Sequence, residues 1–510
     1  MMIVTSLLKA PSVSYGIQGP ADTSAITCYT LIQLQRGLVI MMPRKRPDIL
    51  YIHSHDTGRY VQPYGHAVPT PNIQRLAREG VLFRKAFAAA PTCSPSRASL
   101  LTGLHPHNNG MLGLAHRGFS LSNPAQHLIY TLRKEAGYYT ALIGEEHITT
   151  DPNRIGYDTV VPVRNFHASV VAPAAVRFLR EGPRQPFFLS VGFFETHREF
   201  TASETAPDAA YTLPPAPLPD TPQTRRDMAA YKAAASALDR GIGEILDALD
   251  ALDLAEETLV ICTTDHGIPF PLMKGNLTDH GIGVMLIMRG PGGFRGGKVS
   301  DALISQVDIF PTLCDLLEIE PPAWLQGRSF LPIVHGKMES IHDAIFAEVT
   351  FHASYEPVRA IRTERWKYIR RFDTYRKPVL PNCDDGPSKE LLLRHGWKER
   401  VQPPEQLYDL LFDPQECCNL AAMPAYDQIL QRMRQRLHAW MQETRDPLLA
   451  GPVRPPVGVE LNPPEQRSAG DPTFRVSPPV PAMEILREEP PASRKLLPAV
   501  TGNSSGRSQH

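Results

Sequence analysis

The stretch CSPSRASLLTG, from Cys93 to Gly103, decides how the rest of the chain is interpreted. Pro95 suits the first turn of a helix, where its missing N–H costs no hydrogen bond. Cys93 is therefore expected just ahead of a helix N-terminus, where the helix dipole and free N–H groups favour negative charge. Arg97 adds a fixed cation. A nucleophile, a positive helix end and a guanidinium together predict a site for an anion such as sulfate or phosphate.

Short apolar runs on both sides of this stretch end in polar or charged residues, as buried parallel strands do. These runs are Asp48–Ser54, Tyr139–Ile143, Phe187–Val191 and Thr258–Cys262. Apolar residues with a helical period lie between them. This alternation predicts an α/β fold with a mostly parallel sheet sandwiched by helices. The polar residues after each strand are expected at the carboxyl edge of the sheet, where open α/β sheets bind ligands.

The pattern changes from about Ile341 and predicts a smaller C-terminal α+β domain. Val358–Ile361 and Trp366–Ile369 are expected to be strands, and Ile429–Met441 an amphipathic helix. The expected divisions are an N-terminal extension over 1–42, a catalytic domain over 43–340, an antiparallel-sheet subdomain over 341–446, and a disordered Pro-rich tail over 447–510.

The first forty residues show neither a signal-peptide pattern nor a clear helix or strand period. Two interpretations stay open. Translation starts at Met41 or Met42, or the segment is a genuine disordered extension.

Bulk composition argues against several classes of function. Lys plus Arg and Asp plus Glu are both 53, so the net charge is zero and no nucleic-acid or anionic-membrane partner is expected. No apolar stretch is long enough to span a membrane. The seven cysteines show neither a metal-binding CxxC spacing nor a disulfide framework. A reducing, cytoplasmic location is therefore expected, and the oligomeric state stays open.

The stretch at Cys93 resembles the sulfatase signature C-x-P-S-R. Within the sulfatase family, part of the alkaline phosphatase superfamily, the chain is most similar to the heparan sulfamidase (N-sulfoglucosamine sulfohydrolase) branch, from about Asp48 to Glu443. Further motifs carry the resemblance: HDTG from His55, PNIQRLAREGVLF from Pro71, GEEH from Gly144, FFETHR from Phe193, TTDHGIPFP from Thr263, VDIFPTL from Val307 and LYDLLFDPQECCNLA from Leu407. It implies a sulfuric ester hydrolase for sulfate esters or N-sulfates, sulfated sugars included.

The resemblance also implies a nucleophile and its partners. In the family, a formylglycine-generating or radical-SAM maturation enzyme oxidises the signature cysteine to formylglycine, and its hydrate attacks sulfur. Cys93 would hold this nucleophile, supported by Arg97. His147 and His197 match family histidines that bind the nucleophile or protonate the leaving group. Lys274 falls where the family places a cation on the sulfate.

One divalent metal ion is implied, with His55, Asp56, Cys93, Asp265 and His266 around it. The common family pattern is Asp-Asp and Asp-Asn, whereas here each pair keeps one Asp and carries one His. Family resemblance and oxygen ligands favour Ca²⁺. The imidazoles shift the expected preference to Mn²⁺ or Zn²⁺. A second TDHG, at Thr278–Gly281, follows no expected strand and is not assigned to the metal.

Two positions depart from the family pattern. Glu145 stands where the family has a sulfate-binding Lys, and Phe194 where the closest relatives have a His. We expect Glu145 at the pocket rim, selecting a substrate with a cationic or hydroxyl-rich group. Arg198 is expected either to contact the sulfate or a sugar carboxylate, or to be a surface cation.

Two alternatives remain. The same superfamily includes phosphodiester and phosphonate monoester hydrolases, which use the same fold. The second alternative is a catalytically inactive binding protein with the same fold, and the main observation in its favour is Glu145. The intact set of Cys93, Arg97, His147, His197 and Lys274 argues against inactivity.

Overall fold

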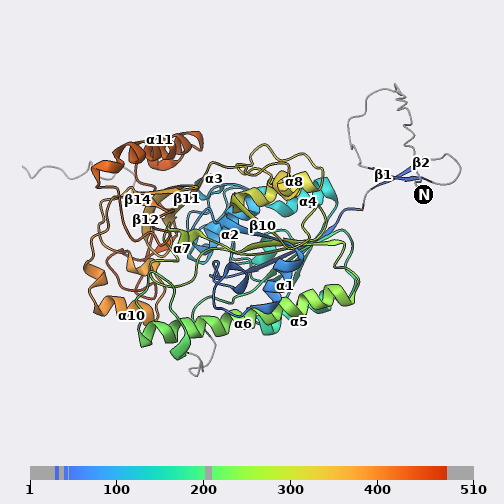
Figure 1. The fold of residues 1–510 in the computed structure, drawn as a ribbon, viewed down its shortest axis with the longest axis horizontal. Helices are drawn as coiled ribbons and strands as arrows, with labels where there is room; N and C mark the ends of the chain where they lie inside the picture. Colours follow the sequence, from blue (N-terminus) through green and yellow to red (C-terminus); the bar gives the residue numbers. More distant parts are fainter. Residues whose placement is uncertain (1–28, 34–38, 44, 201–208, 479–510) are drawn as a thin grey trace, which may run out of the picture.

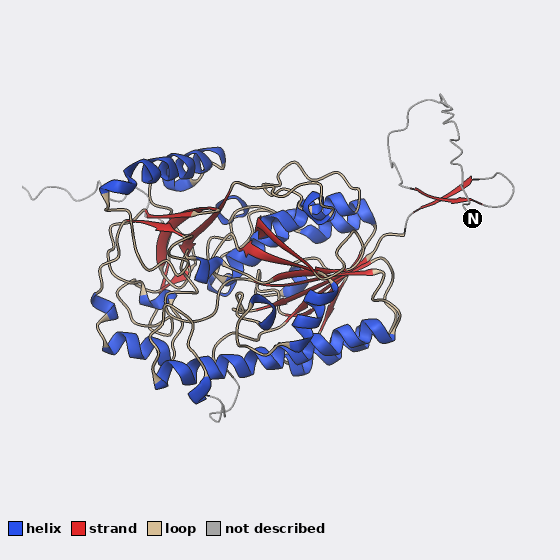
Figure 2. Cartoon of the chain, in the orientation of Figure 1, coloured by secondary structure: helices blue, strands red, loops and turns tan. Residues whose placement is uncertain are grey.

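A large central sheet forms the middle of the molecule (Figures 1 and 2). The computed structural model describes residues 29–33, 39–43, 45–200 and 209–478. The sheet has eight strands in the order β10-β4-β9-β8-β3-β7-β5-β6, and β9 runs antiparallel to both of its neighbours. The strands are β3 (Asp48–Ser54), β4 (Val81–Phe87), β5 (Tyr139–Gly144), β6 (Thr159–Val161), β7 (Phe187–Gly192), β8 (Thr258–Thr264), β9 (Leu286–Arg289) and β10 (Lys298–Ser305). The predicted mostly parallel sheet is confirmed.

Helices cover both faces of this sheet (Figure 1). On one face lie α1 (Pro71–Glu79), α5 (Ala168–Arg180) and α6 (Pro222–Ala251). On the other lie α2 (Cys93–Thr102), α4 (Leu128–Ala136) and α8 (Ile309–Leu316). Three further helices are one turn long: α3 (Pro106–Asn109), α7 (Asp279–Ile282) and α9 (Leu331–Val334).

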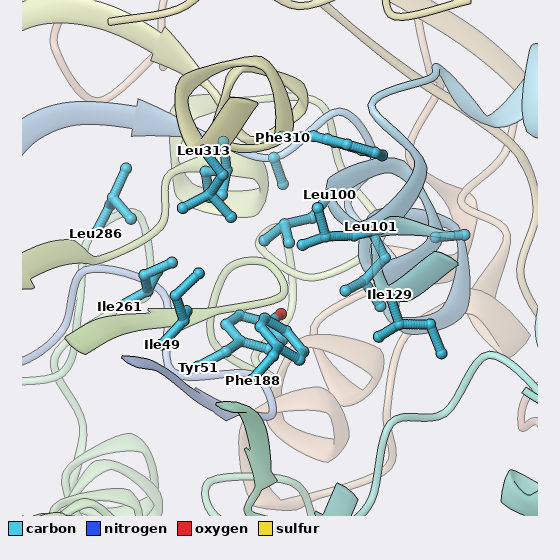
Figure 3. Packing of buried hydrophobic residues seen from close by; sticks show 14 of the residues in the cluster. Ile49, Tyr51, Leu100, Leu101, Ile129, Phe188, Ile261, Leu286, Phe310 and Leu313 are labelled. Atoms are coloured by element: carbon cyan, nitrogen blue, oxygen red, sulfur yellow. The ribbon is translucent and has the colours of Figure 1, made fainter. Parts of the chain in front are cut away.

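Strand β3 shows why the sheet strands are continuous apolar runs. Ile49 and Tyr51 pack into the layer with α2 and α8, while Leu50 and Ile52 pack into the layer with α1, α5 and α6. Successive side chains of a strand point to opposite faces, so burial of both faces favours a continuous apolar run, here Ile49 to Ile52. Figure 3 shows the first layer, where Tyr51 lies against side chains of neighbouring elements.

A second, antiparallel sheet follows in the chain, in the order β11-β12-β13-β14. Its strands are β11 (Ala344–Phe351), β12 (Tyr355–Thr363), β13 (Trp366–Arg371) and β14 (Glu405–Asp409), and its helices are α10 (Pro387–Arg394) and α11 (Asp427–Glu443). One face of α11 packs against this sheet through Leu430, Met433 and Leu437. A smaller C-terminal α+β unit is therefore present, as predicted.

A buried ion-pair network joins helix α3 of the first unit to the second sheet. The Arg359 guanidinium of β12 lies 3.1 Å from Glu348 of β11 and 2.6 Å from Asp446, which follows α11. Glu348 also accepts a hydrogen bond from the ring of His107 in α3, at 2.6 Å. The network therefore links a helix of the first unit to two elements of the second.

The two ends of the chain differ from the sequence-based expectation where they are described. Most of the predicted extension over 1–42 lies outside the described residues, but β1 (Tyr29–Gln33) and β2 (Val39–Pro43) pair antiparallel. The predicted tail lies within the described residues from 447 to 478, and this part includes β15 (Glu460–Leu461) and β16 (Phe474–Arg475). The reason is burial, because Val459 and Leu461 join the main apolar core. None of the helices in the described ranges is long and apolar enough to cross a lipid bilayer.

Candidate active site

The polar residues that follow the strands meet at one edge of the central sheet. In the β3–β8 register Ser54 pairs with Thr264, so His55-Asp56 and Asp265-His266 leave the sheet side by side. In the β5–β7 register Gly144 pairs with Gly192, which brings the segment after Gly144 beside the one that leads to His197. Neighbouring parallel strands end at the same edge. The pairing of these strands therefore brings the polar residues that follow them together at one edge of the sheet.

Cys93 is the first residue of α2, and Thr92 is the N-cap. Its Sγ atom lies 3.3 Å from His266 Nε2 and 3.9 Å from Asp56 Oδ1. The side chain is only 2% exposed. Burial raises the pKa of the Cys93 thiol well above its ordinary value. An unmodified thiol in this position is therefore protonated and a weak nucleophile.

Two carboxylates and two imidazoles surround Cys93. The ligand atoms of His55, Asp56, Cys93 and Asp265 all lie within 4.8 Å of one another. His266 Nε2 lies 3.2 Å from Asp56 Oδ1, and its Nδ1 is 3.0 Å from the Gly267 carbonyl, to which it donates. That bond leaves Nε2 with a free lone pair directed at the carboxylates.

This donor set fits a divalent metal ion. Both ring nitrogens of His55 are buried and without a hydrogen-bond partner. Burial lowers the pKa of His55 well below its ordinary value, so the ring is neutral, as a metal ligand must be. Carboxylate oxygens together with imidazole nitrogens suit Mn²⁺, Fe²⁺ or Zn²⁺ better than an all-oxygen site does.

The two cations occupy different places in the site. The Arg97 guanidinium contacts His53 Nδ1 at 2.6 Å, the Ser54 carbonyl at 2.8 Å and Asp265 Oδ2 at 3.0 Å. It therefore holds the end of β3 and one acidic residue in place. Lys274 Nζ lies 2.7 Å from Asp56 Oδ2 and 3.3 Å from His197 Nε2.

Lys274 stays charged although it is buried. Burial opposes the charge, but the carboxylates of Asp384 and Asp56 prevail and hold the pKa of Lys274 well above its ordinary value. The distance from Nζ to Asp384 Oδ2 is 3.0 Å. Because the ammonium group of Lys274 contacts Asp56, which lies beside Cys93, it is well placed to bind an anionic substrate.

The two remaining histidines border the site. His147 lies 5.5 Å from His55, ring centre to ring centre, and its Nε2 is 3.1 Å from His116 Nδ1. Burial lowers the pKa of His147 to about 3, so it is neutral at physiological pH. His197 lies 4.0 Å from Asp56 Oδ2. Both rings can exchange a hydrogen bond with a bound substrate.

Two sequence-based expectations need correction. Glu145 does not point to the rim, because its Oε2 lies 3.3 Å from His55 Nε2. Arg198 is not directed at the substrate side. Its guanidinium makes two 2.8 Å hydrogen bonds to Asp227 and lies over the ring of Phe270. A bidentate partner and an aromatic face use most of the donors of Arg198, so its role here is structural.

Sequence reasoning missed His116, His352 and Asp384. Asp384 and His352 come from the second unit, and burial together with nearby Lys274 lowers the pKa of His352 well below its ordinary value. The carboxylate of Asp384 is one of two that neutralise Lys274. None of the three follows a strand of the central sheet, which was the signal that pointed to His55, Asp56, Asp265 and His266.

Comparisons with known proteins agree with this geometry. The family model Sulfatase matches residues 47–319, and the model "N-sulphoglucosamine sulphohydrolase, C-terminal" matches residues 273–391. The chain is similar to N-sulphoglucosamine sulphohydrolase of Homo sapiens, with 31% identity over 81% of this chain and 94% of the relative. It is also similar to an ulvan-active sulfatase of Formosa agariphila, with 28% identity over 81% and 78%.

The fold is also shared with solved structures. A structure described as bound to its substrate D-glucosamine-2-N,6-O-disulfate superposes with a TM-score of 0.64 and 19% identity, over 79% of this chain and 99% of that one. At this low identity, the superposition shows a likeness of fold alone.

Proposed function

This chain belongs to the sulfatase family, and on that premise we propose that it hydrolyses sulfate esters or N-sulfates of sugars through a nucleophile made from Cys93. The protein is a sulfuric ester hydrolase by family. The sugar part of the proposal is supported by the glucosamine sulfohydrolase and the ulvan-active sulfatase among its relatives.

One observation carries the proposal for the site. Cys93 lies beside the ends of β3 and β8, with His266 Nε2 at 3.3 Å and Asp56 Oδ1 at 3.9 Å. Lys274 contacts the other oxygen of the same Asp56 at 2.7 Å. The carboxylate of Asp56, one of the proposed metal ligands, thus lies between the proposed nucleophile at Cys93 and the cation Lys274.

We assign roles as follows. A divalent ion at His55, Asp56, Asp265 and His266 would supply a Lewis acid for a sulfate oxygen. Arg97 keeps Asp265 oriented, and Lys274 binds a second sulfate oxygen. The oxygens of a hydrated formylglycine at Cys93 would lie next to His266 and Asp56. His197, beside Lys274, is placed to give a proton to the leaving oxygen or nitrogen.

A maturation enzyme of the formylglycine-generating or radical-SAM class is a further part of the proposal, as is the choice between Ca²⁺ and Mn²⁺ or Zn²⁺. The cytoplasmic location suggested by the cysteine content stays a prediction.

Mass spectrometry of the Cys93 peptide tests the nucleophile. In a host with a maturation system we expect formylglycine at this position. Cys93→Ala should fold with an unchanged melting temperature and lose about a millionfold in kcat/KM on an aryl sulfate, as nucleophile loss does in other covalent enzymes. An unmodified thiol in fully active enzyme would refute the mechanism.

Paired aryl sulfate and aryl phosphate esters test the reaction class. We expect the higher kcat/KM on the sulfate, and a sulfamate substrate should then distinguish N-sulfate from O-sulfate hydrolysis. A higher kcat/KM on the phosphate ester would instead support the hypothesis that the protein is a phosphodiester or phosphonate monoester hydrolase.

A further inference from the structure

The His55 ring faces two carboxylates with its two opposite nitrogens. Nδ1 lies 3.5 Å from Asp265 Oδ2, and Nε2 lies 3.3 Å from Glu145 Oε2. Neither ring nitrogen has a hydrogen-bond partner, and neither does this oxygen of Glu145. All three atoms are buried. Each nitrogen of the His55 ring therefore faces a different carboxylate, Nδ1 that of Asp265 and Nε2 that of Glu145.

The two sides of the ring are not equivalent. Asp265 belongs to the group of His55, Asp56, Cys93 and Asp265, whose ligand atoms lie within 4.8 Å of one another. Nδ1 is the nitrogen that faces this group. A neutral imidazole that offers its Nδ1 lone pair to an ion carries its proton on Nε2. That N–H then needs an acceptor, and Glu145 Oε2 is the carboxylate facing it.

We propose that Glu145 is a positioning residue for the metal site, accepting the Nε2–H of His55 so that Nδ1 binds the ion. The inference rests on the metal site of the proposed function. It joins two of the departures from the family pattern, the histidine at position 55 and the glutamate at position 145, in one interaction. A lysine at position 145 would direct a cation at the imidazole N–H and leave that donor unpaired.

The backbone of Glu145 is fixed well enough for this task. Its N–H donates to the Gly192 carbonyl of β7 at 3.1 Å. A side chain at Gly192 would place its Cβ 1.8 Å from the Glu145 carbonyl oxygen, so only glycine permits this approach. The Glu145 side chain itself is 19% exposed. The carboxylate is thus held by the edge of the sheet and is partly screened from water.

This arrangement also explains why a carboxylate is tolerated in an anion-binding site. A hydrogen bond to a metal-bound imidazole occupies the carboxylate and spreads its charge towards a divalent cation. The sulfate is then left to Lys274 and to the ion. The role of Glu145 is therefore to orient a ligand, and it does not select the substrate directly.

Metal affinity of purified protein tests the inference without any assay of activity. Metal-stripped wild type, Glu145→Ala and Glu145→Gln are titrated with Mn²⁺ and Zn²⁺, and Kd is measured by calorimetry. Removal of a carboxylate that orients a metal-bound His typically costs about ten- to hundredfold in affinity, and we expect that loss for Glu145→Ala. Glu145→Gln keeps an acceptor oxygen and should lose less.

Glu146→Ala is the matched control, because this neighbouring carboxylate bonds Tyr157 and faces His127 instead of the metal group. Its Kd should equal that of wild type, with folding checked by circular dichroism. Co²⁺-loaded protein gives a second readout. The visible absorption bands should shift in Glu145→Ala and stay unchanged in Glu146→Ala.

A double-variant comparison identifies the route of the effect. In a His55→Asp background there is no imidazole to orient, so Glu145→Ala should change Kd by no more than about twofold, the limit for independent sites. An equal loss in both backgrounds would mean that Glu145 binds the ion itself. A wild-type Kd in Glu145→Ala would overturn the inference while leaving the sulfatase proposal intact. A wild type that binds no ion at all would overturn both the metal site and this inference.

Discussion

At the scale of single residues, position was predictable wherever a residue follows a strand of the central sheet. His55, Asp56, Asp265 and His266 lie together as expected, because a strand ending at a known edge limits where its next residues lie, and their role as metal ligands stays a prediction. The orientation of Glu145 was not predictable, since a side chain on a loop is placed by the partner it meets, and here that partner is His55. The orientation of Arg198 was not predictable for the same reason, because its partner is Asp227.

Metal replacement is the prediction that belongs to this scale. Chelation should abolish activity, and Mn²⁺ or Zn²⁺ should restore more of it than Ca²⁺ does. The reason is that His55 and His266 each offer an imidazole nitrogen, whereas Ca²⁺ prefers oxygen ligands. The measurement is kcat/KM after addition of each ion to stripped enzyme. Full recovery with Ca²⁺ alone would show that the two imidazoles do not contact the ion.

At the scale of elements, the strands were the most predictable part. Of the four strands expected in the central sheet, Asp48–Ser54 matches β3 and the other three end within two residues of the observed ends, whereas β4, β6, β9 and β10 were not predicted. Continuous burial on both faces leaves little choice of residue, so the apolar run and the strand coincide. The ion-pair network between α3 and the second sheet was not predictable, because His107 is 241 residues from Glu348 in the sequence and follows no pattern.

That network should make the folded protein sensitive to acid. Burial alone would raise the pKa of Glu348, but Arg359 and His107 lower it to about 2, against an ordinary value of 4.5. A depressed carboxyl pKa stabilises the fold above pH 4.5, and this stabilisation is lost as the pH falls from 4.5 towards 2. Burial also lowers the pKa of His105 from 6.5 to about 4, which costs stability over that interval because the unfolded chain binds the proton first.

Glu348→Gln tests the acid dependence. At pH 7 it should lower the free energy of unfolding by about 3 kcal/mol, as loss of one partner of a buried charge network does. Its stability should also vary less with pH below 4.5 than that of wild type. Urea unfolding between pH 3 and pH 7 measures both effects. Glu443→Gln, on the exposed side of α11, is the control and should match wild type at every pH.

At the scale of the whole molecule, amino-acid composition gave a wrong prediction of disorder for the segment that follows Asp446 and includes Val459 and Leu461. The Pro-rich sequence after Pro447 suggested disorder, yet Val459 and Leu461 are buried in the main core. Asn462 completes the docking, with its Oδ1 accepting from Arg117 at 2.8 Å and its N–H donating to the Ala353 carbonyl at 2.9 Å. A few apolar residues in a polar segment outweigh average composition when they reach an existing core.

Asn462→Ala should loosen this docked segment. It leaves the partly buried Arg117 guanidinium without its side-chain acceptor, which typically costs about 1–3 kcal/mol. The melting temperature should fall and limited proteolysis should cut between residues 451 and 478 sooner than in wild type. Val457→Ala, at a side chain that is 60% exposed, is the control within the same segment. Equal cleavage rates in all three proteins would show that the segment does not depend on Asn462.

The burial of α2 has a consequence for when the enzyme becomes competent. Every residue from Cys93 to Thr102 is buried, so a separate protein that modifies Cys93 has no access to it once the fold is complete. His266, which lies against the thiol, is 173 residues further along the chain. At a synthesis rate of about 5–20 residues per second, this separation corresponds to roughly 9–35 s on the ribosome. If a maturation enzyme oxidises Cys93, as proposed, it would have to act on the nascent or unfolded chain. The proportion of active molecules would then depend on the rate of oxidation relative to the rate of folding, and enzyme supplied after folding would not increase it.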